Sequence, residues 1–335
     1  MAYRDRRDLA YAAALLAVLG WGSLYPAAKP ALREVTPLMI AFARAGIACL
    51  VLGALSCIQA GGLRRGAAHL RREASAGGRD LVALGLISFS GTSLLAMTAQ
   101  QFLPASVNGL LNNLSPLWLA VYATAAGRAR NGLLLLTGSG LAVLGVAAVL
   151  LGDVQQPAGS ALQVAPPASR AGTGVVLSLA GSLLIAVANL VTRRVTSGRD
   201  PLAVTALAAA WGALPLLVAL ALGWGGSLPA YAGISPGTAG LLVWLGTAST
   251  AFNFSLWFFA LAHLPVTRVA NFQYLIPPLG VALAVLLLKE PAGPGLIAGT
   301  VAIAGGIALA QRGAEPAQNQ RVAPPPVSAP TACAR

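Results

Sequence analysis

Charged side chains are scarce in this sequence. Aspartate, glutamate, lysine and arginine make up 9% of its 335 residues, whereas 57% of the residues are hydrophobic. A water-soluble domain carries about 25% charged residues, so the composition excludes that class and predicts an integral membrane protein. The net charge of +13 does not indicate nucleic-acid binding, because the basic residues cluster in short stretches between apolar runs, as in membrane proteins.

Residues that bind metals or perform catalysis are also few. The chain has three cysteines (Cys49, Cys57, Cys333) and two histidines (His69, His263), without the spacing of a metal site or a disulfide framework. Every aspartate and glutamate falls in a predicted loop, tail or helix end. An intramembrane enzyme would need a metal cluster, paired carboxylates or an activated nucleophile. We therefore expect no enzyme, no metal and no cofactor.

The sequence is rich in long apolar runs. A bilayer core requires about 20 such residues per helix. The first run is read as an uncleaved helix, although Arg6-Arg7 precedes it as in a twin-arginine signal. Ten segments qualify: 9–28, 37–59, 81–100, 105–126, 132–151, 171–192, 201–222, 237–262, 265–288 and 292–311.

The positive charges predict the topology. With the N-terminus in the cytoplasm, sixteen of the 22 lysines and arginines fall on the cytoplasmic side and four outside, while Arg44 and Arg268 lie in or at the edge of helices. This distribution follows the positive-inside rule. We expect a multi-pass protein of the cell membrane, inner or plasma, with both termini in the cytoplasm.

The chain matches itself at a shift of 161 residues. In that register Leu103-Pro104 aligns with Leu264-Pro265, without a gap from about residue 80 to 152; upstream the shift is 164 residues. Because five is an odd number, a second copy of a five-helix repeat enters the membrane from the opposite face. Such inverted repeats are typical of transporters. We predict an all-α integral membrane fold of ten transmembrane helices in two inverted five-helix repeats, 1–152 and 171–311. The proline-rich tail 312–335 is predicted to be disordered and cytoplasmic.

Polar residues recur at matching positions of the two copies. Asn112 and Asn113 align with Gln273 and Tyr274. An unpaired amide in hydrocarbon is costly, so these side chains either bond between helices without a ligand or line a central cavity, which we favour. The third and eighth segments each add a face with i, i+4, i+8 spacing, formed by Ser88, Thr92 and Ala96 and by Ser249, Asn253 and Trp257.

Prolines, aromatic rings and one arginine complete the predicted site. Pro116 and Pro277 free backbone carbonyls and are expected to bend their helices near the amides. Arg44 lies within an apolar segment, where it either orients an anionic substrate group or snorkels to a helix end. The candidate substrate-binding residues are Trp21, Tyr25, Arg44, Thr92, Asn108, Asn112, Asn113, Asn253, Trp257, Asn271, Gln273 and Tyr274.

Two long stretches, 21–52 and 256–309, resemble the drug/metabolite transporter superfamily, specifically its EamA-type branch of ten-helix carriers. The matching positions include Trp21-Gly22-Ser23, Tyr25, Lys29, Pro37 and Arg44 in the first stretch, and Leu275-Ile276-Pro277 and Lys289-Glu290 in the second. The stretch ANLVTRRV, 188–195, is similar to the start of the second copy. Departures from the family pattern are Leu24 in place of a polar residue, and Ile276, Ser115 and Ala129 in place of acidic ones.

The resemblance implies an alternating-access transporter that exports metabolites, amino acids or amphipathic drugs. A nucleotide-sugar or triose-phosphate carrier of the same superfamily remains an alternative, although it would call for several inward cations where this core offers mainly Arg44. A channel, a membrane scaffold and an intramembrane enzyme are more distant alternatives. The expected partners are a small-molecule substrate and the lipid bilayer.

Two further expectations concern coupling and assembly. A proton-coupled antiporter usually keeps an acidic residue or histidine in the membrane, and the predicted segments contain no such carboxylate. We therefore expect facilitated diffusion or coupling to substrate gradients. Gly295-x-x-x-Gly299 and the glycines of 132–151 suit close helix packing, either within the chain or in a homodimer.

Overall fold

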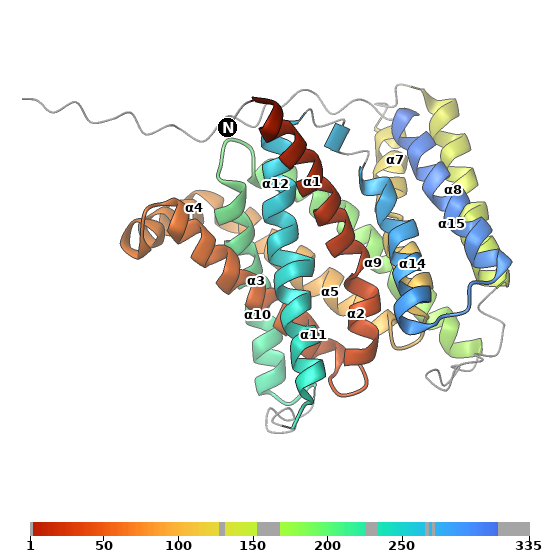
Figure 1. The fold of residues 1–335 in the computed structure, drawn as a ribbon, viewed down its shortest axis with the longest axis horizontal. Coiled ribbons are helices and arrows are strands. Elements are labelled where there is room, and N and C mark those ends of the chain that lie inside the picture. Colours follow the sequence, from red (N-terminus) through yellow and green to blue (C-terminus); the bar gives the residue numbers. More distant parts are fainter. Residues whose placement is uncertain are drawn as a thin grey trace, which may run out of the picture.

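The computed structural model describes residues 3–126, 131–152, 168–225, 233–264, 268–269 and 272–313. Within these ranges the regular elements are all helices (Figure 1). Eight helical runs are long and apolar enough to cross a membrane: Arg6–Ala31, Pro37–Gln59, Leu63–Ala99, Gly132–Leu151, Arg170–Val195, Pro201–Ala221, Pro236–His263 and Pro294–Gly313. The fold is therefore that of an all-α, multi-pass membrane protein.

Some of these runs are single helices and others are composite. The single helices are α3 (Pro37–Gln59), α8 (Gly132–Gly152), α9 (Ala168–Val195), α10 (Pro201–Ala221) and α15 (Pro294–Gly313). The composite runs are α1 (Tyr3–Gly22) with α2 (Leu24–Ala31), α4 (Leu63–Leu84) with η1 (Gly85–Gly91) and α5 (Thr92–Ala99), and α11 (Pro236–Gly246) with η3 (Thr247–Phe252) and α12 (Asn253–His263).

The predicted segments 105–126 and 265–288 consist of shorter helices. The first contains α6 (Ala105–Asn112) and α7 (Ser115–Ala125), and the second contains the 3₁₀ turn η4 (Gln273–Leu275) and α14 (Ile276–Leu288). Pro116 and Pro277 each stand within the first two positions of the following helix, where the missing N–H breaks no hydrogen bond. These prolines therefore mark helix starts, rather than bends inside continuous helices.

Three of the helices begin with a polar N-cap residue that is followed directly by a proline. Thr36 accepts a hydrogen bond from the Met39 N–H ahead of α3, and Asp200 accepts one from the Leu202 N–H ahead of α10. Ser235 does the same for α11. A proline follows each cap, and its fixed φ suits the first helical position. The starts of α3 and α10 are equivalent in the 164-residue register, so both copies begin this helix with the same chemistry.

Helices of one half of the chain pack on helices of the other half. α3 packs on α10, α8 on α15 and α6 on α14, while α1 packs on α12 and α9 on η1 and α5. The register makes α1 equivalent to α9, and α12 equivalent to α5. These last two contacts therefore join equivalent helices: in each, the first helix of one copy packs on the third helix of the other copy.

The α8–α15 contact, visible at one side of the bundle (Figure 1), is a glycine-mediated approach of two backbones. A Cβ added to Gly138 would lie 2.3 Å from the Ala310 nitrogen, and one added to Gly145 would lie 2.8 Å from the Gly299 oxygen. Small residues permit such approach in membranes, where packing rather than hydrophobicity drives helix association. These glycines therefore serve packing within the chain.

Two π-helical turns lie at equivalent positions of the copies. η1 begins at Gly85 and η3 follows Gly246, the residue 161 positions later. A Cβ at Gly85 would lie 2.5 Å from the Ala208 oxygen of α10, and one at Gly246 would lie 2.4 Å from Cβ of Ile47 in α3. Single π turns inside α-helices often occur at functional sites. Here each one contains the first residue of a polar face identified in the sequence, Ser88 in η1 and Ser249 in η3.

Candidate functional site

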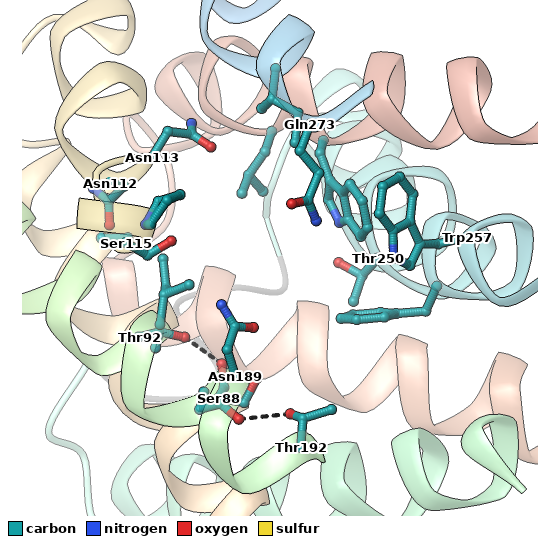
Figure 2. A pocket seen from close by; sticks show the side chains of 18 of the residues that line it. Ser88, Thr92, Asn112, Asn113, Ser115, Asn189, Thr192, Thr250, Trp257 and Gln273 are labelled. Carbon is teal, nitrogen blue, oxygen red and sulfur yellow. Dashed lines mark hydrogen bonds between the residues drawn. The ribbon is translucent and has the colours of Figure 1, made fainter. Parts of the chain in front are cut away.

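An internal cavity of about 510 Å³ lies between the two halves of the chain. Its lining comes from helices of both halves, including α1, α3, α5 and α7 from the first and α9, η3, α12 and α14 from the second. Cavities that hold small organic molecules span about 300–1,000 Å³. Figure 2 shows polar side chains on one side of this space and aromatic rings on another.

Most of the predicted substrate-binding residues line this cavity. Nine of them do so: Trp21, Tyr25, Arg44, Thr92, Asn112, Asn113, Trp257, Gln273 and Tyr274. Pro116 and Pro277 also belong to the lining. Asn108 and Asn253 do not, and Asn271 lies outside the described residues.

Asn108 is the centre of a buried hydrogen-bond network. It is 0% exposed, and its Nδ2 donates to the Ala96 carbonyl at 2.9 Å and to Oε1 of Gln100. Its Oδ1 accepts from Nδ2 of Asn112 at 2.8 Å and from Oγ of Ser178 at 2.5 Å. Because every polar atom of this amide has a protein partner, Asn108 ties α6 to α5 and α9 behind the cavity wall.

Asn253 is buried against the backbone of α1. It is 1% exposed, and its Nδ2 donates to the Ser249 carbonyl at 3.2 Å. The absence of a side chain at Gly20 leaves room for its amide group. The i, i+4 spacing placed Asn253 on one face with Trp257, but that face turns partly toward α1.

Three amide side chains face the cavity from different helices. Asn113, Asn189 and Gln273 converge on the same space (Figure 2). Asn189 on α9 was not among the predicted residues. The 164-residue shift that aligns Lys29 with Arg193 also aligns Tyr25 with Asn189, so applying the repeat to the first helix would have identified it.

Several hydroxyl groups in the lining were also absent from the predicted substrate-binding residues. They belong to Ser93 of α5, Ser115 of α7, Thr192 of α9 and Thr250 of η3. Ser249 of η3 lines the cavity too, and it belongs to a polar face identified in the sequence. Serines and threonines in membrane helices commonly bond the carbonyl four residues earlier, as Thr192 does to Ala188 at 2.7 Å. Their small side chains therefore give little signal in a sequence until a cavity is placed beside them.

Arg44 reaches the cavity from α3. Its Nη1 donates to Oγ of Ser93 at 3.1 Å and its Nη2 to Oγ1 of Thr250 at 3.5 Å. Its Nε is buried and meets no hydrogen-bond partner among the described residues. The guanidinium therefore bridges α5 of one half and η3 of the other through neutral hydroxyls, with a donor left over.

Aromatic rings form a continuous wall of the cavity. The Trp21 ring lies 5.2 Å from Trp257 and 5.8 Å from Phe254, both edge to face, and Phe254 stacks on Phe258 at 6.0 Å. All four side chains line the cavity. Such edge-to-face pairs add stabilisation beyond their buried area and give the space a rigid apolar side.

Two charged residues hold one end of the bundle together. Nζ of Lys29 donates to the carbonyls of Gln100 at 2.7 Å and Leu103 at 2.6 Å, just beyond α5. The carboxylate of Glu290, 3% exposed, accepts from the N–H groups of Ala105 at 2.7 Å and Ser106 at 3.0 Å, at the start of α6. A carboxylate suits a helix N-terminus, so both charges bind helix ends, outside the cavity lining.

The opposite end of the bundle is where the cavity extends. Leu261 near the end of α12, Thr196 beyond α9 and Gln311 near the end of α15 belong to its lining. The charged contacts described above lie where α2 and α14 end and α6 begins. The structure is therefore closed at one end of the helices and hollow toward the other.

The fold and the cavity together define a class: a multi-pass, all-helical membrane protein with an internal cavity between its halves that is lined by both polar groups and aromatic rings. The EamA-like transporter family matches residues 8–151 and again 172–311. The chain belongs to this family of membrane transporters.

Two similar proteins are consistent with this assignment. A protein of Streptantibioticus cattleyicolor described as "Probable terminal-alkyne amino-acid exporter" is 26% identical over 309 residues, which is 90% of this chain and 93% of the relative. A crystal structure with 20% sequence identity superposes with a TM-score of 0.60 and covers 90% of this chain and 96% of its own. The second likeness concerns the fold alone.

Proposed function

We propose that the protein is an alternating-access exporter of small organic metabolites, with amino acids or amphipathic drugs as the substrate class. Substrate occupies the central cavity, and the two five-helix repeats, 1–152 and 171–311, rock around it. The observation that carries this proposal is a cavity lined by corresponding positions of both copies, such as Asn112 with Gln273 and Pro116 with Pro277. Midplane sites between inverted repeats are typical of such carriers.

The reciprocal packing of the halves supports the inverted arrangement. The pairing of α1 with α12 and of α9 with η1 and α5 is what a two-fold axis in the membrane plane would produce. The described state is hollow toward the ends of α9, α12 and α15. The positive-inside rule predicts a cytoplasmic location for that end, so we assign this state to the inward-facing step, in which an exporter loads its substrate.

The similar exporter of amino acids supports the substrate class. In our proposal the amides of Asn113, Asn189 and Gln273 contact polar groups of the substrate, and the wall of Trp21 and Trp257 contacts its apolar part. Asn108 and Asn253 support the wall from behind. No chemistry is performed on the substrate.

Energy coupling in this proposal is by the substrate gradient. Glu290, predicted at the end of the segment 265–288, is the buried carboxylate among the described residues. It is bonded to the start of α6, outside the lining. A carboxylate fixed in this way suits anchoring rather than proton relay. A pH gradient across proteoliposomes should leave the initial rate of export unchanged, and a strong dependence on that gradient would overturn this part of the proposal.

Counterflow in proteoliposomes tests the proposal as a whole. Vesicles preloaded with an unlabelled apolar amino acid should accumulate the labelled form transiently and saturably. Asn113→Leu should reduce this flux at least tenfold, whereas Gln101→Leu, at an exposed loop position, should match the original protein. Flux that rises linearly without competition would indicate a channel, and no flux of amino acids or cationic drugs above empty vesicles would refute a carrier.

A further inference from the structure

The charge of the cavity is of one sign. Among the described residues of its lining, the charged ones are Arg44 and Arg193, and none is an aspartate, a glutamate or a histidine. Arg193 is exposed near the end of α9, where water screens its charge. Arg44 lies inside the cavity, where the surrounding low dielectric strengthens its field.

Among the residues that the structure describes, none provides a counter-ion for Arg44. Its hydrogen-bond partners are the neutral hydroxyls of Ser93 and Thr250, and the second bond is long at 3.5 Å. A guanidinium carries five N–H donors in a planar fork that matches a carboxylate, and its Nε–H is buried without a partner. A partly buried cation without a counter-ion is less favourable than one paired with an anionic group.

A second unpartnered group lies in the same lining. Ser249 is 0% exposed, and its hydroxyl has no hydrogen-bond partner within the described part of the chain. It stands on η3 directly before Thr250, which contacts Arg44. The arginine fork and the Ser249 hydroxyl thus offer several donors on one side of the cavity, which suits the acceptor oxygens of a carboxylate. The Thr250 hydroxyl is not among these donors, because it already donates to the Leu245 carbonyl at 2.7 Å.

The remaining walls describe the rest of the ligand. Rings of Trp21, Phe254, Trp257 and Phe258 provide an apolar face. The amides of Asn113, Asn189 and Gln273 can accept hydrogen bonds from an ammonium group, but no carboxylate is present in the described lining to pair with one. Recognition of a negative charge therefore dominates over recognition of a positive one.

We propose that Arg44 is the specificity residue of the cavity and selects small carboxylic acids with an apolar body, including apolar α-amino acids. This proposal rests on the transport function proposed above. It predicts that the carboxylate is essential for binding, whereas the ammonium group is dispensable. Cationic amphipathic drugs are then excluded, because they would place a second positive charge beside Arg44.

Three related probes separate these requirements. L-Phenylalanine carries both charges, its methyl ester keeps the ammonium group but loses the carboxylate, and N-acetyl-L-phenylalanine keeps the carboxylate alone. Binding to the purified full chain can be followed through the fluorescence of the cavity tryptophans and by ligand-dependent thermal stabilisation. The two carboxylates should bind about tenfold or more tighter than the ester, as expected for a charge-assisted bidentate contact.

Variants at Arg44 assign the selection to this residue. Arg44→Gln should abolish the preference for the acids over the ester, and Arg44→Lys should restore part of it. Arg72→Gln, at an exposed position on α4, is the matched control and should keep the full preference. If Arg44→Gln does not fold, the comparison of Arg44→Lys with the original protein decides, because lysine keeps the charge but loses the fork.

The results distinguish the two proposals. Equal binding of acid and ester by the original protein, or an unchanged preference in the Arg44 variants, would overturn the role of Arg44 while leaving a transporter in place. Saturable transport of cationic drugs in proteoliposomes would do the same. Absence of saturable transport for every probe and drug would instead refute the transport function, and this inference with it.

Discussion

Gly20 and Asn253 interlock where α1 crosses α12. A Cβ added to Gly20 would lie 2.2 Å from Oδ1 of Asn253 and 2.7 Å from its Nδ2. Gly20→Ala should therefore lower stability by about 1–3 kcal/mol through overpacking. The thermal midpoint in detergent measures this.

Two comparisons make the Gly20 prediction specific. Gly53→Ala is the control, because a Cβ at that helical position would meet no atom within 4 Å, and alanine is the better helix former. Replacing Asn253 by alanine in the Gly20→Ala background should recover part of the lost stability. Equal behaviour of the Gly20 and Gly53 variants would show that the contact is absent.

Substitutions of Asn108 and Asn113, two amides of one short stretch, should impair different properties of the protein. Asn108→Leu removes the centre of a buried network and leaves Gln100, Asn112 and Ser178 without their shared partner. Each buried group left unpaired costs about 1–3 kcal/mol, so the yield of folded protein should fall. Asn113→Leu should retain a near-normal thermal midpoint and lose transport. Reversed outcomes would exchange the roles of the two residues.

The α8–α15 contact should be intolerant of added volume on one face only. Gly306→Leu would drive a side chain into Ala142 and Gly138, since even a Cβ there would lie 2.6 Å from the Ala142 nitrogen. Gly140→Leu, on the same pair of helices, would meet open space. Size-exclusion profiles and thermal midpoints should show loss for the first variant and little change for the second.

Glu34 links the loop after α2 to the start of α11 and predicts a pH response. Its carboxylate accepts from the Ser235 N–H and hydroxyl, both at 2.7 Å, and these bonds hold its pKa below the ordinary value of 4.5. The stabilisation is therefore present above that ordinary value and is lost as the pH falls through the lower, folded-state pKa.

A single variant isolates the Glu34 contribution. The difference in thermal midpoint between the original protein and Glu34→Gln should be largest near neutral pH and shrink as the solution is acidified below pH 4.5. A difference that grows on acidification would contradict the assigned direction.

Hydropathy and capping chemistry predict much of this fold. The predicted segment 37–59 coincides with α3, because Thr36 and Pro37 define its start and an apolar run carries it to its end. The broken helices could not be predicted in the same way, since hydropathy is blind to the interruption at Asn113-Leu114. The π turns could not be predicted either. Hydropathy depends on the side chains, so an apolar run has the same hydropathy whether each N–H bonds to the carbonyl four or five residues earlier.

The cavity shows where sequence periodicity reaches its limit. Spacing identified polar faces on several helices, and the repeat connected Asn112 with Gln273 across the chain. Asn108 and Asn113 lie in one short stretch, yet the first faces α5 and α9 and the second faces the cavity. Which neighbour covers which face depends on the packing of distant segments, and a single sequence does not contain that information directly.

The π turns have a consequence for the angular phase of the helices that contain them. A wider turn holds one residue more than an α-helical turn, and one residue corresponds to about 100° of rotation around an α-helix. Inserting one residue into a continuous α-helix would rotate everything downstream, whereas a π turn absorbs the extra residue within itself. The helix after η1, beginning at Thr92, and the helix after η3, beginning at Asn253, therefore keep the phase of the helix before the turn. Because the 161-residue register runs through both turns without a gap, the two copies carry this extra residue at equivalent positions.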